Sequence, residues 1–228
     1  MSLRVRVLLL ILTIVGAMAL PSAQPADSQE AQRLRSATLV WNEVMAVRDQ
    51  AIPTSVLEMA EGIAVFPATL KGGFIVGGIR GRGVLSARTG ESWSPPTFMT
   101  MTGGSFGLQI GGEEVDVVLV IMNRRGLENF LSNQFKFGAN AAAAAGPVGR
   151  DAQASTDLQL RAEILSYSRS RGLFAGLTVN GASVRTDRDA NERFYGKPLD
   201  GPQVALQGLA DTRVPVPDWT ATLARYTK

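Results

Sequence analysis

The side chains whose types and spacing best suit anion binding are Lys71, Arg80, Arg82, Arg88 and Trp93. The four cations flank or follow a glycine-rich stretch, and the indole lies just beyond them. Arg80 and Arg82 have the same parity along a strand, so both guanidinium groups would project from one face and could hold one multivalent anion. The alternative is scattered, solvated charge. These five residues are the candidate ligand-binding set.

Three acidic side chains, Glu113, Glu114 and Asp116, offer a second kind of chemistry. Glu114 and Asp116 would share one strand face, where carboxylates can act as acid and base or hold a hard cation. No calcium-loop pattern surrounds them, and an acidic cluster at the start of a strand is usually a solvated edge. The sequence therefore predicts no metal site here, and an enzyme that uses these acids is only a rival hypothesis.

The 228 residues include no cysteine and no histidine, which excludes whole classes of site. There can be no disulfide, no thiol nucleophile, no thiolate or imidazole metal site, and no histidine-based triad. The glycine-rich stretch lacks the G-x-G-x-x-G spacing of dinucleotide sites, and Gly196-Lys197 is followed by Pro198, so no P-loop is present. We expect a protein that is not an enzyme and has no cofactor.

Residues 1–23 are predicted to be a signal peptide. Arg4 and Arg6 precede an apolar run over residues 7–20, and small side chains follow it. The run is shorter than the roughly 20 residues that span a bilayer, so an uncleaved anchor is the less favoured alternative. We therefore expect a periplasmic or secreted protein, peripheral on the envelope membrane if it meets a membrane at all.

Cleavage of this segment changes the charge of the chain. It removes two arginines and leaves 21 basic against 20 acidic side chains, a net charge of +1. So small a charge gives no global field to attract nucleic acid, and nucleic acid is not expected as a partner. Any anion must be held by a local patch.

Residues 28–48 have the spacing of an amphipathic helix, with Leu34 and Trp41 on its apolar face. This face could cover a sheet, which is the favoured interpretation. Alternatively, the helix could lie in a membrane interface, with Arg35, Trp41 and Arg48 as membrane-contact residues.

The rest of the chain is rich in strand patterns. Short apolar or alternating runs, punctuated by glycine and proline, occur in residues 62–66, 72–120, 162–168 and 173–179. Asn180-Gly181 is typical of a tight hairpin turn and would lead into a strand at 182–186. The predicted fold is α+β: a strongly curved, glycine-rich antiparallel sheet, sandwich- or barrel-like, packed with the N-terminal helix and short helices.

Glycine recurs every fourth residue from Gly73 to Gly81 and again from Gly103 to Gly111. In a strand, this spacing places each glycine on the same face. Such a stripe permits close packing and curvature, or leaves room for a ligand or lipid chain. Residues 28–200 are predicted to form one domain, and the proline-rich residues 201–228 a loosely attached tail that ends in a short helix.

A series of short sequence motifs across this domain resembles the SYLF-domain family, which is known from yeast actin-patch proteins, an animal SH3-containing relative and secreted bacterial members. The motifs are AEGIAVFP (60–67), KGGF (71–74), GRGVL (81–85), WSPP (93–96), GLQIG (107–111), DVV (116–118), AGPVGR (145–150), SYS (166–168), GLFAGL (172–177) and YG (195–196). Together they cover roughly residues 34–196.

The resemblance implies lipid binding, especially to phosphoinositides, and in the yeast relatives actin binding. The actin role is not expected to transfer to a chain with a signal peptide. Binding to anionic phospholipid headgroups transfers more readily, through positions that correspond to residues 34–48, Lys71, Arg82 and Arg88. We therefore expect a lipid-binding protein of the cell envelope whose partner is an anionic lipid or membrane surface. The rival is a structural module that binds another protein.

Overall fold

The computed structural model describes residues 28–46, 51–73, 76–106, 111–132, 134–141, 143–148, 162–170, 173–176, 181–211 and 217–227. The predicted signal peptide and Arg48 lie outside the described residues.

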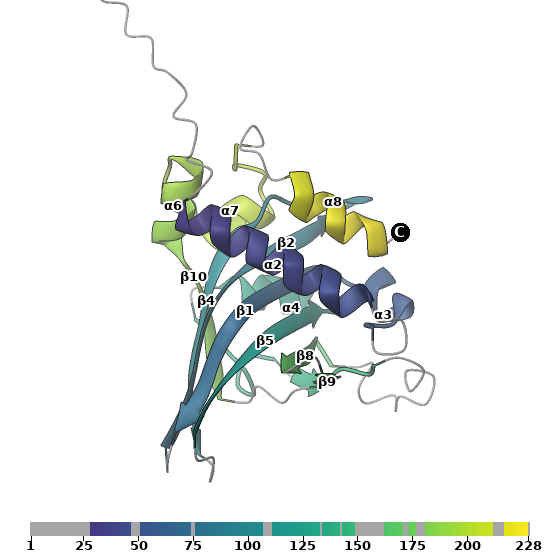
Figure 1. Cartoon of the computed structure of the whole chain (residues 1–228). Coiled ribbons are helices and arrows are strands. Elements are labelled where there is room, and N and C mark those ends of the chain that lie inside the picture. Colours follow the sequence, from purple (N-terminus) through teal and green to yellow (C-terminus); the bar gives the residue numbers. More distant parts are fainter. Residues whose placement is uncertain are drawn as a thin grey trace, which may run out of the picture.

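A strongly curled sheet of ten strands forms the centre of the molecule (Figure 1). The strands are β1 (Gly62–Gly73), β2 (Val76–Thr89), β3 (Ser92–Trp93), β4 (Thr97–Phe106), β5 (Gly111–Ile121), β6 (Phe135–Lys136), β7 (Ala143–Ala145), β8 (Ile164–Ser170), β9 (Leu173–Gly176) and β10 (Ala182–Thr186). Eight of them follow the order β6-β10-β4-β2-β1-β5-β8-β7, while β3 pairs with β2 and β9 with β8. Pairing is antiparallel except between β7 and β8.

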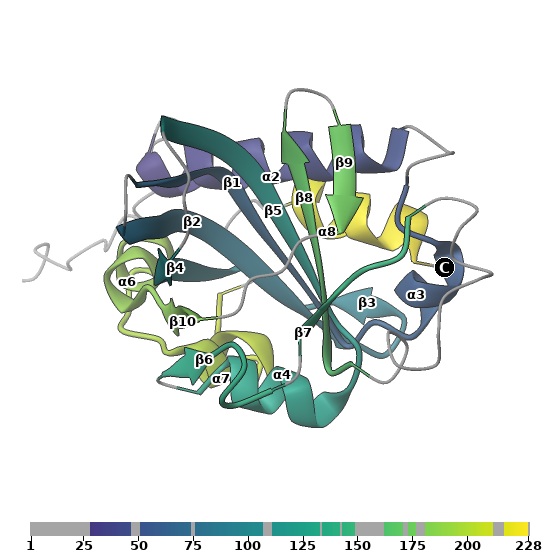
Figure 2. The same ribbon diagram turned by 90° about the horizontal axis from the view of Figure 1, so that it is seen from below.

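Helices cover both faces of this sheet, which confirms the predicted curved α+β fold. They are α2 (Gln29–Ala46), α3 (Thr54–Glu58), α4 (Arg124–Phe130), α6 (Arg188–Tyr195), α7 (Gly201–Ala205) and α8 (Pro217–Tyr226). Figure 2 shows α2 and α8 on one side of the sheet and α4 and α7 on the other. We call these the α2 side and the α4 side.

The central strands are apolar at successive positions because each side has its own core. On β5, Val118 and Val120 join the core under α2, while Val117 and Leu119 join the core that includes α4. Strands buried on both faces lose the alternation of polar and apolar residues and read as continuous apolar runs. This explains the continuous apolar run over residues 117–121 of β5.

A β-bulge in β1 contributes to the curvature. The register of β1 shifts between Phe66 and Thr69 against β5, and between Val65 and Leu70 against β2. Ala68 has a positive φ of 47°, and its N–H donates to the Asp116 carboxylate at 3.0 Å. A bulge bends its strand and increases the local twist.

Two glycines of the predicted stripe are sites of close approach. A Cβ on Gly81 would lie 2.4 Å from Thr69 Oγ1, and one on Gly103 would lie 2.7 Å from the Cα of Ala182. At these positions the glycines permit tight packing between strands.

The predicted pairing of the strands before and after Asn180-Gly181 is wrong, and Asn180 itself lies outside the described residues. β9 pairs with β8, whereas β10 pairs with β4 and β6, near the opposite edge of the sheet. A turn motif carries only local information, whereas the strand partners of β10 depend on burial of its side chains Ala182 and Val184 in the α4-side core.

The C-terminal segment also departs from expectation, because it is not a loosely attached tail. Trp219 and Leu223 of α8 are fully buried in the core under α2. The Trp219 indole Nε1–H donates to Ser86 Oγ at 2.8 Å. Residues 201–227 as described are therefore part of the domain, and the boundary predicted at residue 200 does not separate two units.

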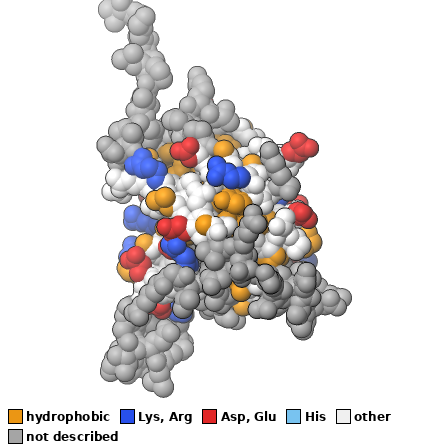
Figure 3. Space-filling model, turned by 45° about the vertical axis from the view of Figure 1, so that its right-hand side comes forward, with side chains coloured by type: hydrophobic (Ala, Val, Ile, Leu, Met, Phe, Trp, Pro, Cys, Tyr) orange, Lys and Arg blue, Asp and Glu red, His pale blue; other side chains and the backbone are white. Residues whose placement is uncertain are grey.

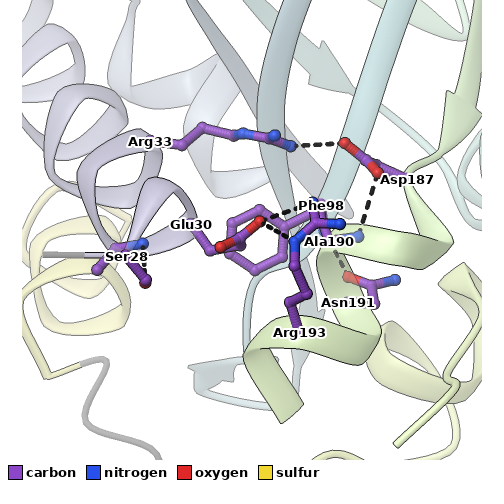
Figure 4. A network of polar contacts seen from close by, with 9 residues as sticks. Ser28, Glu30, Arg33, Phe98, Asp187, Ala190, Asn191 and Arg193 are labelled. Carbon is purple, nitrogen blue, oxygen red and sulfur yellow. Dashed lines mark hydrogen bonds and ion pairs between the residues drawn. The ribbon is translucent and has the colours of Figure 1, made fainter. Parts of the chain in front are cut away.

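Ion pairs fix the beginning of α2 against α6 (Figure 4). Arg33 Nη1 lies 3.0 Å from Asp187 Oδ2, and the Arg33 guanidinium lies 5.3 Å from the centre of the Phe98 ring. Arg193 binds Glu30 Oε1 at 2.8 Å. These contacts set the position of α2 across the sheet.

Candidate functional site

Arg80 and Arg82 project together from the α2 side of the sheet, as their parity predicted. β2 pairs with β4 without a register shift, and Val84 of the same parity belongs to the core under α2. Both arginine side chains are exposed. No carboxylate of the described residues lies within 4.0 Å of either guanidinium group.

These arginines lie in the first half of β2, towards the end of the strand that connects to β1. Figure 1 shows the long strands β1, β2, β4 and β5 running past α2 towards the lower left. Leu70 lies directly opposite Arg80 in the β1–β2 ladder, and its side chain is 59% exposed. Leu70, Arg80 and Arg82 together are called the β1–β2 surface. A shallow cavity of about 400 Å³ at this end of the sheet is lined by Leu70 and Arg80 and also by residues of the adjacent row, Lys71, Ile79 and Glu113.

Lys71 does not belong to this surface. It pairs with Ile79, and adjacent positions on a strand point to opposite faces. The predicted grouping of Lys71 with the two arginines is therefore incorrect, because the bulge in β1 shifts every later side chain to the other side.

Arg88 and Trp93 form an internal contact far from Arg80 and Arg82. Arg88 Nε and Nη2 donate to the carbonyls of Ala60 at 2.7 Å and Leu57 at 2.8 Å. The guanidinium lies 4.8 Å from the Trp93 ring centre, and the buried Trp93 Nε1–H donates to Thr227 Oγ1 at 3.0 Å. These partners give both residues a structural role and leave them poorly placed for a ligand.

The predicted membrane-contact residues also separate. Trp41 is fully buried in the core under α2, so the structure corrects its proposed role as an exposed anchor. Among the described residues, its indole Nε1–H has no hydrogen-bond partner. Arg35 is exposed on α2, and Arg48 lies outside the described residues. The apolar face of α2 covers the sheet, which was the favoured interpretation.

The acids at the start of β5 do not converge. Asp116 binds Arg169 at 2.9 Å and accepts the Ala68 N–H, while Glu113 accepts a hydrogen bond from Ser170. Glu114 is exposed and, being adjacent to Glu113, lies on the opposite face. Among the described residues, no three acidic side chains are grouped to hold a metal ion.

Sequence reasoning missed two cations on the α2 side, Lys136 and Arg185. Across the ladders, Arg82 pairs with Thr100 and Thr100 with Arg185. The next row begins with Arg80 of β2, which pairs with Thr102 of β4. It continues through Ser183 of β10 to Lys136 of β6. No local motif marks Lys136 or Arg185, because only the order of the strands brings them near β2.

Charges are mixed on the one face of the molecule that Figure 3 shows. On the face shown in Figure 3, positive and negative side chains are interspersed, and the coloured hydrophobic side chains form no large continuous area. Among the helices that the structure describes, none is long and apolar enough to cross a membrane.

Comparison with known proteins gives consistent matches. The family model described as "Ysc84: Las17-binding protein actin regulator" matches residues 102–228. The chain is 33% identical over 181 residues to LAS seventeen-binding protein 3 of Saccharomyces cerevisiae, covering 78% of this chain and 39% of that protein. It is 34% identical over 149 residues to SH3 domain-containing YSC84-like protein 1 of Mus musculus, covering 64% of this chain and 44% of that protein.

A third relative is SH3 domain-containing protein PJ696.02 of Schizosaccharomyces pombe, 32% identical over 201 residues, or 84% of this chain and 46% of that one. The chain thus spans less than half the length of these curated relatives. The family model covers more than half of the chain, and the relatives extend the similarity across most of the described fold. The chain therefore belongs to the Ysc84 family of SYLF-domain proteins.

Proposed function

We propose that this protein is a non-catalytic binding protein that contacts anionic lipid surfaces through the β1–β2 surface. The observation that carries the proposal is the pair of exposed arginines beside the exposed Leu70, on strands that extend beyond the helices. Arginine and an apolar side chain on one projecting edge suit the boundary between headgroups and acyl chains.

The expected affinity is modest. Each Lys or Arg near an anionic surface contributes about 1 kcal/mol, an effect that fades within a Debye length as salt is added. Glu114 lies opposite Leu70 in the β1–β5 ladder and lowers the local positive charge. Binding should therefore be weak for one molecule and strongly salt-dependent. The sequence of residues 1–23 supports a periplasmic or secreted location for this contact, at the surface of the envelope membrane.

Sedimentation with vesicles tests the proposal. The protein is mixed with neutral phosphatidylcholine vesicles and with vesicles that also contain phosphatidylglycerol, at low and high salt. We expect binding to the anionic vesicles only, and a loss of roughly tenfold or more in the double variant Arg80→Gln, Arg82→Gln. Arg225→Gln is the matched control, because Arg225 is an exposed arginine on α8. Unchanged binding in the double variant would contradict the proposal.

A second candidate function is binding to another protein. The supporting observation is that relatives carry names such as LAS seventeen-binding protein 3 and SH3 domain-containing YSC84-like protein 1. If no vesicle type sediments the protein, this candidate becomes the leading one.

A further inference from the structure

A second set of polar side chains lines a cavity of about 640 Å³ next to strands β4, β10 and β6. The polar lining residues are Thr102, Gln134, Lys136, Asn140, Ser183 and Arg185. We call this cavity the β6–β10 pocket. Thr102 pairs with Ser183, and Ser183 with Lys136, so these three side chains form one row on the α2 side.

Each polar side chain of the lining carries at least one hydrogen-bond donor. Lys136 and Arg185 are positively charged, and no carboxylate is among the lining residues. Within the part of the chain that the structure describes, no acidic side chain lies within ion-pair distance of either cation. Two uncompensated positive charges around one cavity favour a doubly charged anion.

The loop that carries two of these side chains is fixed by its own hydrogen bonds. The Lys136 N–H donates to Asn140 Oδ1 at 2.7 Å, and the Asn140 N–H donates back to the Lys136 carbonyl at 2.9 Å. Phe137 N–H donates to the Ala182 carbonyl of β10 at 2.9 Å. Because Asn140 Oδ1 is occupied, the amide NH₂ remains to donate to a ligand. A preformed loop lowers the entropic cost of binding.

The number and geometry of the donors distinguish between anions. A carboxylate offers two oxygens, whereas a phosphate monoester offers three terminal oxygens and a charge near −2. The planar fork of Arg185 can bind two of these oxygens, and Lys136 can act as a point charge on the third. The hydroxyl groups of Thr102 and Ser183 add further donors.

We propose that the β6–β10 pocket binds a phosphate monoester, carried either by a lipid headgroup or by a small soluble molecule. Arg185 and Lys136 neutralise the phosphate, and Ser183, Thr102 and Asn140 complete its hydrogen bonds. The proposal does not rest on lipid contact at the β1–β2 surface, because the pocket contains none of the residues of that surface. Its size leaves room for a polar group attached to the phosphate.

Nuclear magnetic resonance of the ¹⁵N-labelled protein, with inorganic phosphate and glycerol 3-phosphate as probes, tests the pocket. We expect saturable amide shifts in residues 134–141 and 183–185. Lys136→Gln and Arg185→Gln should each weaken this binding at least about tenfold, whereas the control variant Arg225→Gln should not. Absence of saturable shifts in these segments, or unchanged affinity in the double variant Lys136→Gln, Arg185→Gln, would overturn the proposal.

Vesicles distinguish the two sources of the phosphate. Phosphatidic acid presents a monoester, whereas phosphatidylglycerol presents a diester. If the pocket carries a lipid headgroup, the double variant loses a preference for phosphatidic acid. If the ligand is soluble, the double variant loses glycerol 3-phosphate binding alone. Phosphate binding without any vesicle binding would contradict the proposed lipid contact and support the β6–β10 pocket. Vesicle binding without phosphate binding would support the lipid contact and contradict the pocket.

Discussion

Lys71 and Arg80 project from opposite faces of the sheet, although their strands pair with each other. Leu70 is the residue opposite Arg80, and Lys71 is opposite Ile79. Before the bulge, Val65 pairs with Val84 on the α2 side, so an unbroken β1 would have placed Lys71 there too. The bulge reverses this parity, because one extra residue moves every later side chain to the other face.

This relationship predicts unequal effects of two variants that remove the same charge. Arg80→Gln should weaken binding to anionic vesicles about fivefold, whereas Lys71→Gln should weaken it less than twofold. The long-range electrostatic term is the same in both, so the difference reports local contact at the β1–β2 surface. Vesicle sedimentation at one salt concentration measures both, and equal losses would show that net charge alone governs binding.

A structural role for Arg88 predicts loss of stability without loss of binding. Arg88→Gln removes charged hydrogen bonds to the Ala60 and Leu57 carbonyls and the contact with the Trp93 ring. We expect the free energy of unfolding in urea to fall by about 2–3 kcal/mol. Vesicle affinity of the folded variant should match that of Arg225→Gln. A variant of normal stability that no longer binds vesicles would instead restore Arg88 to the ligand-binding set.

The features that sequence could predict depend on local periodicity. The three- and four-residue spacing of Leu34, Ala37 and Trp41 predicted a helix, and that face does cover the sheet. The parity of Arg80 and Arg82 predicted their common face correctly because β2 has no register shift against β4. Where a strand is regular, its sequence alone assigns its faces.

The features that sequence could not predict depend on distant partners. The strand predicted at residues 62–66 is too short, because β1 continues through the bulge to Gly73. Lys136 and Arg185 approach the β2 arginines only because β10 and β6 join the sheet beside β4. Trp219 packs into the core under α2 and its indole donates to Ser86, contacts that no pattern in a proline-rich segment indicates.

Two glycines of β2 should respond differently to the same substitution. A Cβ on Gly83 would lie 2.3 Å from the Val65 carbonyl oxygen, a backbone atom, whereas one on Gly78 would meet nothing nearer than 3.5 Å. We expect Gly83→Ala to lower the free energy of unfolding by about 3 kcal/mol, through overpacking. Gly78→Ala should leave it within about 0.5 kcal/mol or raise it, because alanine restricts the unfolded chain. Similar effects of the two in urea unfolding would contradict the close approach at Gly83.

Buried tyrosines predict how stability falls at high pH. Burial raises the pKa of the Tyr195 and Tyr167 phenols above the ordinary value, which is about 10. The unfolded chain then releases protons above pH about 10 while the folded chain retains them. The stability contribution of both phenols is therefore fully present below that pH and is lost as the pH rises beyond it.

Absorbance at 295 nm and circular dichroism, followed together during alkaline titration, check this expectation. Ionisation of Tyr195 and Tyr167 should coincide with loss of the folded signal. Tyr195→Phe should reduce the slope of unfolding free energy against pH, and it also removes the hydrogen bond to the Pro96 carbonyl at 2.6 Å. Ionisation of all three tyrosines in the folded protein would contradict the prediction.

The Arg33–Asp187 pair should couple α2 to α6 much more strongly than an exposed pair of the same length. The Arg33 and Asp187 side chains lie 3.0 Å apart and are only 7% and 17% exposed. Those of Arg124 and Glu128 are also 3.0 Å apart, but they are 53% and 57% exposed. Asp187→Asn keeps an oxygen that can accept the Ala190 N–H at the start of α6, so it removes the charge while sparing the cap. Arg33→Met keeps most of the side-chain volume.

A double-mutant cycle separates the ion pair from these other contacts. Either single variant leaves a partly buried polar group without its partner and should lower the free energy of unfolding by about 3 kcal/mol. The double variant removes both charges, so its loss of unfolding free energy should be smaller than the sum of the two single losses by about 1–3 kcal/mol. The same cycle on Arg124 and Glu128 should give a coupling free energy of less than about 0.5 kcal/mol, because water screens that pair. Equal coupling in the two cycles would mean that burial does not strengthen the Arg33–Asp187 contact, and that α2 is positioned by its apolar face alone.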